Sequence, residues 1–423
     1  MTTGPTQYRH NHYVPEWYQR RFMPPGVSRF HYLDLAPEAR SENGHIWTRR
    51  AILPWGPDRC FAQNDLYTTR WGSISNTDIE QFFFGKLDQD APGAVDYFAS
   101  LRPRHADGDA FNAFLRYMSV QKLRTPKGLA WLRHVTRSLD PNYTLLQLQK
   151  LQNLFCATWS DCVWQIADAA QSSTKFIVSD HPVTVYNREC FPGSPACAPP
   201  KDPDVRQVGT HTIFPLSLEK VLILTNLAWV RNPYQDARRM GPNEKLLRTA
   251  VFNFQDIQFD RFLSEEEVRE INFVIKKRAL RYVAAAEKDW LYPETHLRSD
   301  HWRKLGDGYL LMPDPRHVYM GGTTYIGYKG GHSEAFGPYG HRPWERSFED
   351  KARDQSESRS LQKFQAEWAA MIGPEYRGVS CRFGDDARTR MQDEFHQHYL
   401  DKDAEERRKL GERARRRHLR RDG

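Results

Sequence analysis

The sequence lacks the features by which membrane-spanning and disulfide-stabilised proteins are recognised. It contains no run of about eighteen apolar residues, the length that a membrane-spanning helix requires. Its six cysteines are scattered along 423 residues without a C-x-x-C pair, so they predict neither a disulfide framework nor a usual zinc site. The first residues carry no signal-peptide pattern. We therefore expect a cytoplasmic protein with reduced thiols and no membrane partner.

Common catalytic and phosphate-binding motifs are missing as well. Ser179 is not surrounded by the G-x-S-x-G pattern of a nucleophile elbow. The glycines at 321 and 322 are not followed by the G-K-[ST] of a phosphate-binding loop. The literal string His10-Asn11-His12 does not indicate an HNH nuclease, because three consecutive residues cannot all face one metal ion. Any site must therefore be assembled from distant parts of the chain.

Positive charge is concentrated at the C-terminal end. The formal net charge is +8, and residues 407–423 contain nine Lys or Arg and two acids, a surplus of +7. The remainder of the chain is therefore close to neutral and is not a generally basic surface. Nucleic acid is the partner that such a tail would contact, and a solvated terminus is the alternative. The candidate nucleic-acid-binding residues are Arg415, Arg416, Arg417, Arg420 and Arg421.

The apolar pattern predicts an α+β fold with a mainly helical body, a small antiparallel sheet and a helical, basic C-terminal extension. Residues 142–170 carry apolar side chains at helical spacing, so we expect a central core helix there. A second helix is expected over residues 264–286, opened by a capping box at Ser264. Strands are expected over residues 175–178 and 183–186, interrupted by Ser179-Asp180-His181-Pro182. We divide the chain into an α+β body (1–298), a Gly/Tyr/His-rich linker (299–344) and a helical extension (345–423).

Several short motifs, taken in order, resemble a family known as domain of unknown function 4238. The resemblance covers roughly residues 7–286 and implies an α+β body without implying a reaction. The chain departs from the family pattern at His181, where Asn is expected, and in the extension that follows residue 287. The motifs that carry the resemblance are His12-Tyr13-Val14-Pro15, Tyr18 with Arg20-Arg21-Phe22, Asp65-Leu66-Tyr67, Ile79-Glu80, Gln121 with Arg124-Thr125-Pro126, Ser179-Asp180-His181-Pro182, Phe214-Pro215-Leu216-Ser217 and Asn272.

Polar residues in apolar or junction positions form the candidate site. An N-terminal arm with His12 and Arg21 is expected to fold into the body, because such chemically capable side chains are uncommon at a frayed terminus. His12 is the candidate general acid or base. Glu80 and Asp180 would orient His12 or hold a divalent cation. The candidate substrate-binding residues are Arg21, Gln121, Arg124 and Ser179.

A structural interpretation of the same residues stays open. Arg21 and Glu80 would then form a buried ion pair, and His12 would only cap a helix or bond a carbonyl group. The turn at Ser179 and Asp180 would satisfy local backbone donors.

Two functions follow from these interpretations. The first is a hydrolase that acts on a phosphate-bearing substrate, with a nuclease as one form of it and a divalent metal as its cofactor. The second is a non-enzymatic protein that binds nucleic acid or another partner through the basic tail. The sequence indicates no particular oligomeric state.

Overall fold

The computed structural model describes residues 10–42, 45–100, 107–160, 162–195, 197–207, 209–226, 257–306, 324–328, 330–336 and 341–372, together with residues 310, 408, 409 and 412. Almost all of the basic tail lies outside this part of the chain. No helix within the described residues is long and apolar enough to cross a membrane.

The first part of the chain consists of short strands around one five-residue helix. Its elements are β1 (His10–His12), α1 (Glu16–Arg20), β2 (Phe30–Asp34), β3 (Ala39–Glu42), β4 (His45–Thr48), β5 (Ile52–Trp55), β6 (Ala62–Asn64), β7 (Thr69–Trp71) and β8 (Ile74–Asn76).

A helical region comes next. It begins with a π-helical turn, η1 (Ile79–Phe84), and continues through α2 (Gly85–Ala99), α3 (Gly108–Arg124), α4 (Pro126–Thr136), α5 (Pro141–Lys150) and α6 (Cys156–Ser160).

Strands dominate the following part, with one long helix near its end. The elements are β9 (Val163–Asp168), β10 (Val178–Ser179), β11 (Thr184–Asn187), β12 (Thr210–Pro215), β13 (Lys220–Thr225), β14 (Gln258–Phe262), α8 (Glu265–Arg278) and β15 (Tyr282–Ala285).

The last described elements are short turns, a hairpin and a helix. They are η4 (Asp289–Leu291), η5 (Pro293–Thr295), η6 (Trp302–Lys304), β16 (Thr324–Gly327), β17 (Ser333–Phe336), η8 (Arg346–Phe348) and α9 (Lys351–Ile372).

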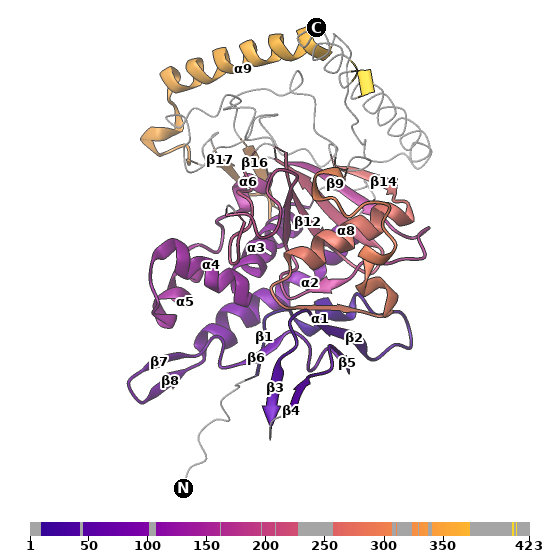
Figure 1. Cartoon of the computed structure of the whole chain (residues 1–423). Helices are drawn as coiled ribbons and strands as arrows, with labels where there is room; N and C mark the ends of the chain where they lie inside the picture. The colour runs from indigo at the N-terminus through magenta and orange to yellow at the C-terminus, as the bar shows by residue number, and fades with distance from the viewer. Residues whose placement is uncertain are drawn as a thin grey trace.

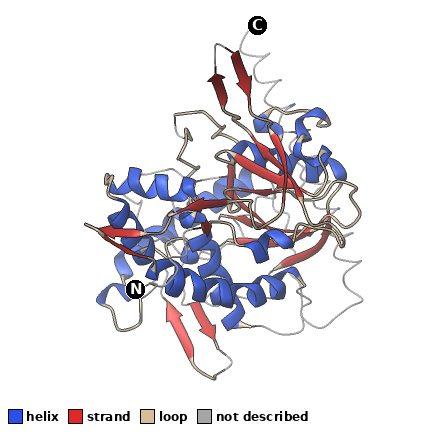
Figure 2. Cartoon of the chain, turned by 90° about the horizontal axis from the view of Figure 1, so that it is seen from below, coloured by secondary structure: helices blue, strands red, loops and turns tan. Residues whose placement is uncertain are grey.

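The prediction of a mainly helical body with one small antiparallel sheet is wrong. The described strands form a five-stranded sheet in the order β11-β12-β13-β9-β14 and a four-stranded sheet in the order β10-β15-β2-β5, besides four two-stranded pairs. The five-stranded sheet is mixed, because β14 runs parallel to β9. Figure 2 shows helices and strands distributed through the whole body. The chain is α+β with several sheets, and the helices supply only part of the core.

Two stretches with helical spacing contain strands, and this explains the error. Residues 142–170 form α5, α6 and then β9, where β9 lies between β13 and β14 and is buried almost throughout. Residues 264–286 form α8 and then β15. A strand that is buried on both faces shows a continuous apolar run, which spacing alone does not distinguish from a helix.

The predicted signal at the start of a helix is confirmed. Ser264 accepts a hydrogen bond from the Glu267 backbone, and the Glu267 side chain accepts one from the Ser264 backbone, which completes the predicted capping box. Thr125 caps α4, with Pro126 at the first helical position. The interruption between β10 and β11 is also present, and the chain crosses there from the four-stranded to the five-stranded sheet.

Gly128 allows α3 and α4 to meet closely. A Cβ atom at this position would lie 2.2 Å from the carbonyl oxygen of Lys122 and 2.5 Å from that of Leu123. Any larger residue would therefore push the start of α4 away from the end of α3. This close approach brings Lys122 and Lys127 to the same side of the junction, where the candidate site lies.

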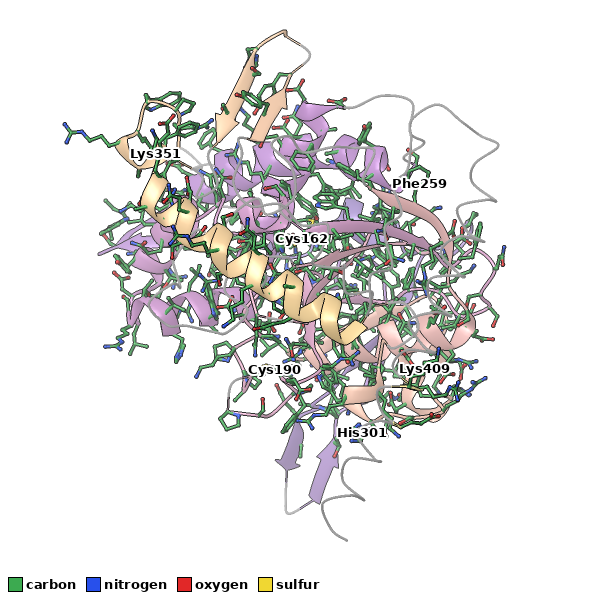
Figure 3. The ribbon with its side chains drawn as sticks, turned by 90° about the horizontal axis from the view of Figure 1, so that it is seen from above. Cys162, Cys190, Phe259, His301, Lys351 and Lys409 are labelled. Carbon is green, nitrogen blue, oxygen red and sulfur yellow. The ribbon has the colours of Figure 1, made fainter. Side chains whose placement is uncertain are left out.

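The C-terminal elements lie at one end of the molecule. In Figure 1, α9 lies beyond β16 and β17, whereas the hairpins β3–β4 and β7–β8 lie at the opposite end. Seen from above, α9 crosses the body from its first residue, Lys351 (Figure 3). The hairpin contacts α3 through Tyr328, whose hydroxyl lies 3.1 Å from the Asn112 side-chain nitrogen. The division into three segments at residues 298 and 344 stays a prediction.

Candidate functional site

The N-terminal arm folds into the body, as predicted. Strand β1 pairs with β6, and the Tyr13 backbone N–H donates to the Phe61 carbonyl at 3.0 Å. Val14, Tyr18 and Phe22 are fully buried in the main core. Burial of such large apolar side chains holds the arm in place. The polar side chains of the arm are therefore fixed relative to the helices.

His12 bonds within the arm's own surroundings. Its Nε2 lies 3.2 Å from the Asp58 carbonyl oxygen and 3.9 Å from a carboxylate oxygen of Glu16. Burial lowers the pKa of His12, and the Glu16 charge opposes this effect. The carbonyl bond agrees with the structural interpretation of this residue. Neither Glu80 nor Asp180 is a hydrogen-bond partner of His12.

Two predicted substrate-binding residues, Gln121 and Arg124, meet at the end of α3. Arg124 is fully buried, and its two terminal nitrogens donate to the Asp88 carboxylate at 2.9 and 3.0 Å. Its Nε donates to the Gln121 side-chain oxygen at 2.7 Å. The Gln121 amide donates in turn to the Tyr13 carbonyl of the arm at 2.8 Å. We call Glu80, Asp88, Gln121 and Arg124 the arm cluster.

Glu80 belongs to the arm cluster through the π-helical turn η1. Its side chain hydrogen-bonds to Asn11, and its Oε2 is buried without a hydrogen-bond partner in the described part of the chain. Burial raises the pKa of Glu80 to about 7, although the Arg124 charge acts to lower it. A carboxyl group with such a pKa exchanges protons at neutral pH. Turns of this helical type occur frequently at functional sites.

Arg21 lies apart from the arm cluster. Its Nε donates to the Leu216 carbonyl at 2.6 Å, and its terminal nitrogen pairs with Asp96. The Arg21 carbonyl accepts the Leu218 backbone N–H at 2.9 Å. Its ion-pair partner is therefore Asp96 and not Glu80. These bonds attach the arm to the turn between β12 and β13.

Asp180 stabilises the junction between the two larger sheets. Its carboxylate accepts the backbone N–H groups of Leu280, Arg281 and Tyr282 at 2.9, 2.6 and 2.8 Å. The neighbouring Ser179 hydroxyl accepts the His181 backbone N–H at 3.2 Å. Both side chains are buried, and neither lines the pocket described next. Within the described residues, no group of three or more His, Cys, Asp or Glu side chains is placed to hold a metal ion.

A pocket of about 790 Å³ opens beside the junction of α3 and α4. Its walls come from these two helices, from residues near the start of α6, and from the proline-rich loop between β11 and β12. Cys190 of this loop, labelled in Figure 3, is one of the lining residues. The volume lies in the range that accommodates small organic ligands.

Two lysines share one carboxylate at the wall of this pocket. The Lys122 and Lys127 ammonium groups each donate to a different oxygen of Asp202, both at 2.6 Å. All three residues are buried or nearly so. Burial lowers the pKa of Lys122, and the Asp202 charge opposes this effect. Although burial acts to raise it, the two ammonium groups hold the pKa of Asp202 well below its usual range.

Arg278 adds a third buried cation. The Lys127 ammonium donates to the Arg278 carbonyl at 2.8 Å, and the Arg278 charge is close enough to act on Lys122. The Arg278 guanidinium donates to the Cys190 carbonyl and lies over the Trp302 ring, 5.0 Å from its centroid. Its Nε is buried without a hydrogen-bond partner in the described part of the chain.

His181 joins the lysines and the aspartate. Its Nδ1 lies 2.8 Å from the Thr125 hydroxyl, and its Nε2 lies 3.1 Å from Asp202. Nε2 also lies 3.3 Å from the Lys122 ammonium group, so the ring contacts Lys122, Asp202 and Thr125. Burial lowers the pKa of His181 to about 3, and Lys122 acts in the same direction, so the imidazole is neutral at pH 7. We call Lys122, Lys127, His181, Asp202 and Arg278 the pocket cluster.

One comparison with known proteins gives a match. The family model described as protein of unknown function (DUF4238) matches residues 10–289. The chain belongs to the DUF4238 family. No curated protein and no solved structure matches the chain. The matched range agrees with the resemblance seen in the sequence motifs.

Both clusters lie inside the DUF4238 region. The arm cluster uses α2, α3 and η1, and the pocket cluster uses α3, α4, α8 and the loops at residues 180–183 and 200–207. The hairpin β16–β17 and helix α9 lie outside it. The geometry of both sites is therefore built by the DUF4238 region, with Trp302 as an addition from beyond its end.

Sequence reasoning missed the pocket cluster. Lys122 lies between the predicted residues Gln121 and Arg124, but on a helix its side chain points to another side. The sequence marks His181 as a departure from the family pattern and not as a partner of lysines. Asp202 and Arg278 carried no local signal, since their partners are far away in the sequence. The five tail arginines, Arg415, Arg416, Arg417, Arg420 and Arg421, lie outside the described residues.

Proposed function

We propose that the protein binds a small phosphate-bearing molecule in the pocket beside α3 and α4. The supporting observation is the charge of the pocket cluster. Lys122 and Lys127 bond to one carboxylate, Asp202, Arg278 is a third buried cation nearby, and His181 is neutral, which leaves two positive charges. A phosphate monoester carries a charge of about −1.5 to −2 at pH 7, so it would balance the cluster more fully than a single carboxylate would.

Burying charge without compensation is costly. The effective penalty is several kcal/mol for each ion that is removed from water without a good partner. An anion in the pocket would lower this cost, because Lys122 and Lys127 line the pocket. The neutral His181 would add no charge to the pocket, but its contact with Asp202 would help to keep this carboxylate in place. The cluster thus favours an anion over a neutral ligand of the same shape.

Calorimetric titration with inorganic phosphate at low ionic strength tests this proposal. We expect Lys127→Met to weaken phosphate binding by about tenfold or more, because each 1.4 kcal/mol of lost interaction is a factor of ten. Lys276→Met is the matched control. Lys276 is similarly buried and pairs with Glu294 at 2.6 Å, but it does not line the pocket. Equal affinity in both variants, or no binding by the unchanged protein, would contradict the proposal.

Hydrolysis of a phosphate-bearing substrate is a second proposal, and Glu80 is the observation that favours it. A pKa of about 7 suits a group that acts as general acid or base at neutral pH. His12, Asp180 and a divalent cation are the further participants that the sequence suggested. Since Glu80 does not line the pocket, this reaction would take place at the arm cluster.

Release of phosphate from a panel of phosphate esters, RNA and DNA with Mg²⁺ or Mn²⁺ tests the second proposal. We expect Glu80→Gln and His12→Ala to abolish turnover, whereas Lys127→Met would leave it unchanged. Glu219→Gln serves as the control, because Glu219 is a partly exposed residue that pairs with Lys175 away from both clusters. Absence of turnover, or turnover that survives both changes, would exclude this reaction.

A further inference from the structure

The pocket has a second wall of a different chemical kind. Whereas the pocket cluster is charged, this wall is apolar and partly aromatic, with Trp131 and Phe155 as its largest side chains. Their ring centroids are 6.2 Å apart and their planes are tilted by 44°. Phe155 is held from behind by Trp159, at 5.2 Å between centroids. The aromatic wall is therefore rigidly supported by the core.

The two walls meet at the end of α3. The Lys122 ammonium group lies 5.9 Å from the centroid of the Phe155 ring. Phe155 is thus close both to the cation that would hold the phosphate and to Trp131. A ligand that occupies both walls needs only a short connection between its anionic group and its apolar part. A long spacer would carry the apolar part beyond the aromatic pair.

Apolar side chains continue to the mouth of the pocket. Val135 and Leu154 both line it, and they are 55% and 39% exposed. Pro200, Pro203 and Val205 line it from the facing loop. Apolar residues gathered at an opening in this way mark a surface that a ligand covers. A single exposed leucine or valine would need no such explanation.

We infer that the phosphate-bearing ligand carries an aromatic ring close to its phosphate group. This inference rests on the proposed function, because it assigns the other end of the same ligand. The ring would lie against Trp131 and Phe155 while the phosphate contacts Lys122 and Lys127. Aromatic side chains prefer another ring in an offset or edge-to-face arrangement, and such pairs gain more than the buried area alone provides. An alkyl chain of equal size would gain only from burial.

Titrations with three ligands separate the two ends of the site. Inorganic phosphate probes the cations alone, phenyl phosphate adds a six-carbon ring, and n-hexyl phosphate adds a six-carbon chain. We expect phenyl phosphate to bind about tenfold more tightly than inorganic phosphate and more tightly than hexyl phosphate. Trp131→Leu should remove most of the gain from the ring while leaving the affinity for inorganic phosphate unchanged.

The choice of variants separates a loss of binding from a loss of folding. Trp131 is only partly buried, so its replacement by leucine is tolerated more readily than a change at Phe155. Trp71→Leu is the control, because Trp71 is 60% exposed on the β7–β8 hairpin and does not line the pocket. Lys127→Met should weaken all three ligands alike.

The outcomes distinguish the two proposals. If hexyl phosphate binds as tightly as phenyl phosphate, the ligand is an amphiphile with a flexible chain and the inference is wrong. If neither gains over inorganic phosphate, the inference is also wrong, but the proposed anion site stands. If none of the three binds, the proposed function fails and the inference fails with it.

Discussion

The end of α3 carries two polar clusters that differ in how their charges are balanced. In the arm cluster, the three guanidinium nitrogens of Arg124 donate to Asp88 and Gln121, and two aromatic rings lie beside the group. In the pocket cluster, two lysines bond to the same carboxylate, that of Asp202, beside the pocket. Gln121 and Arg124 of the arm cluster and Lys122 of the pocket cluster are all buried at the end of this helix.

This difference indicates different roles. A cation whose nitrogens are all bonded within the protein has little left with which to bind a ligand, so Arg124 chiefly fixes the arm against the helices. A cluster with excess charge next to a pocket gains stability when an anion arrives. Groups with shifted pKa values occur at functional sites and in structural ion pairs alike, so a shifted pKa alone does not separate the two clusters. Their charge balance does.

The largest expected effect is that of Asp202→Asn. This change leaves the buried ammonium groups of Lys122 and Lys127 without their carboxylate, and breaking a buried pair typically costs about 3–5 kcal/mol. Urea unfolding measures the loss, and added phosphate should restore part of it. Asp204→Asn is the control, because Asp204 pairs with Arg206 at a partly exposed position, where a pair contributes about 1 kcal/mol or less. Equal losses in the two variants would show that Asp202 stabilises the protein no more than a partly exposed aspartate of the same loop.

Arg124→Met should cost somewhat less. It breaks the paired arm cluster, but Asp88 is 28% exposed and water can solvate the carboxylate that remains. We expect a loss of about 2–3 kcal/mol in the free energy of unfolding. The affinity for phosphate, measured by calorimetry, should stay unchanged. A drop in phosphate affinity as large as that of Lys127→Met would mean that the two clusters act as one site.

Glu80 should make stability fall as the pH rises. The folded-state pKa is raised to about 7, above the value of about 4.3 in an unfolded chain. The stabilisation is therefore fully present below about pH 4.3 and is lost as the pH rises through about 7. We expect a decrease of about 2 kcal/mol between about pH 5 and 8 that is absent in Glu80→Gln. Parallel pH profiles for the two proteins would show that Glu80 is ionised throughout.

His181 should have the opposite dependence. Its folded-state pKa of about 3 is below the value of about 6.5 for an unfolded chain. The stabilisation is therefore present above about pH 6.5 and is lost as the pH falls towards 3. His211 has a pKa lowered in the same direction, so the informative quantity is the difference between the unchanged protein and His181→Gln. That difference should shrink by about 1–2 kcal/mol on acidification from about pH 7 to 5.

The smallest effect should come from Lys122→Met. Lys127 still pairs with Asp202 in this variant, and one repelling cation is gone. We expect the free energy of unfolding to stay within about 1 kcal/mol of the unchanged protein, or to rise. Thermal or urea unfolding checks this against Lys276→Met, which leaves Glu294 unpaired. A loss for Lys122→Met as large as that for Lys276→Met would show that the cluster has no excess charge.

Local chemistry in the sequence located several elements correctly. The capping signals at Ser264 and at Thr125-Pro126 lie where α8 and α4 begin, because a cap depends on residues only a few positions apart. The apolar pattern does not distinguish helix from strand at two places. Strand β9 is buried between two neighbours, and β15 directly follows α8, so their apolar residues continued a helical pattern. Only the tertiary arrangement distinguishes the two.

The candidate site also contains residues that the sequence indicates and residues that it does not. Gln121 and Arg124 could be picked out because polar residues stood in an apolar helix next to a cap. The partner of Lys122 and Lys127 is an aspartate some eighty positions later in a proline-rich loop. Nothing in the loop itself distinguishes Asp202 from Asp204. Pairing over such distances is set by how the sheets and helices fold together, and a single sequence does not record it.

Asp180 and His181 are adjacent in the chain but serve different parts of the structure. The Asp180 carboxylate holds the junction between two sheets, and the His181 imidazole lines the pocket. A substitution that releases the three amide groups bound by Asp180 would shift the backbone that carries His181. Asp180→Ala would then impair ligand binding from a distance and imitate the loss of a catalytic acid. Asp180→Asn keeps one acceptor oxygen, so comparing the two variants separates a displaced neighbour from a missing proton donor.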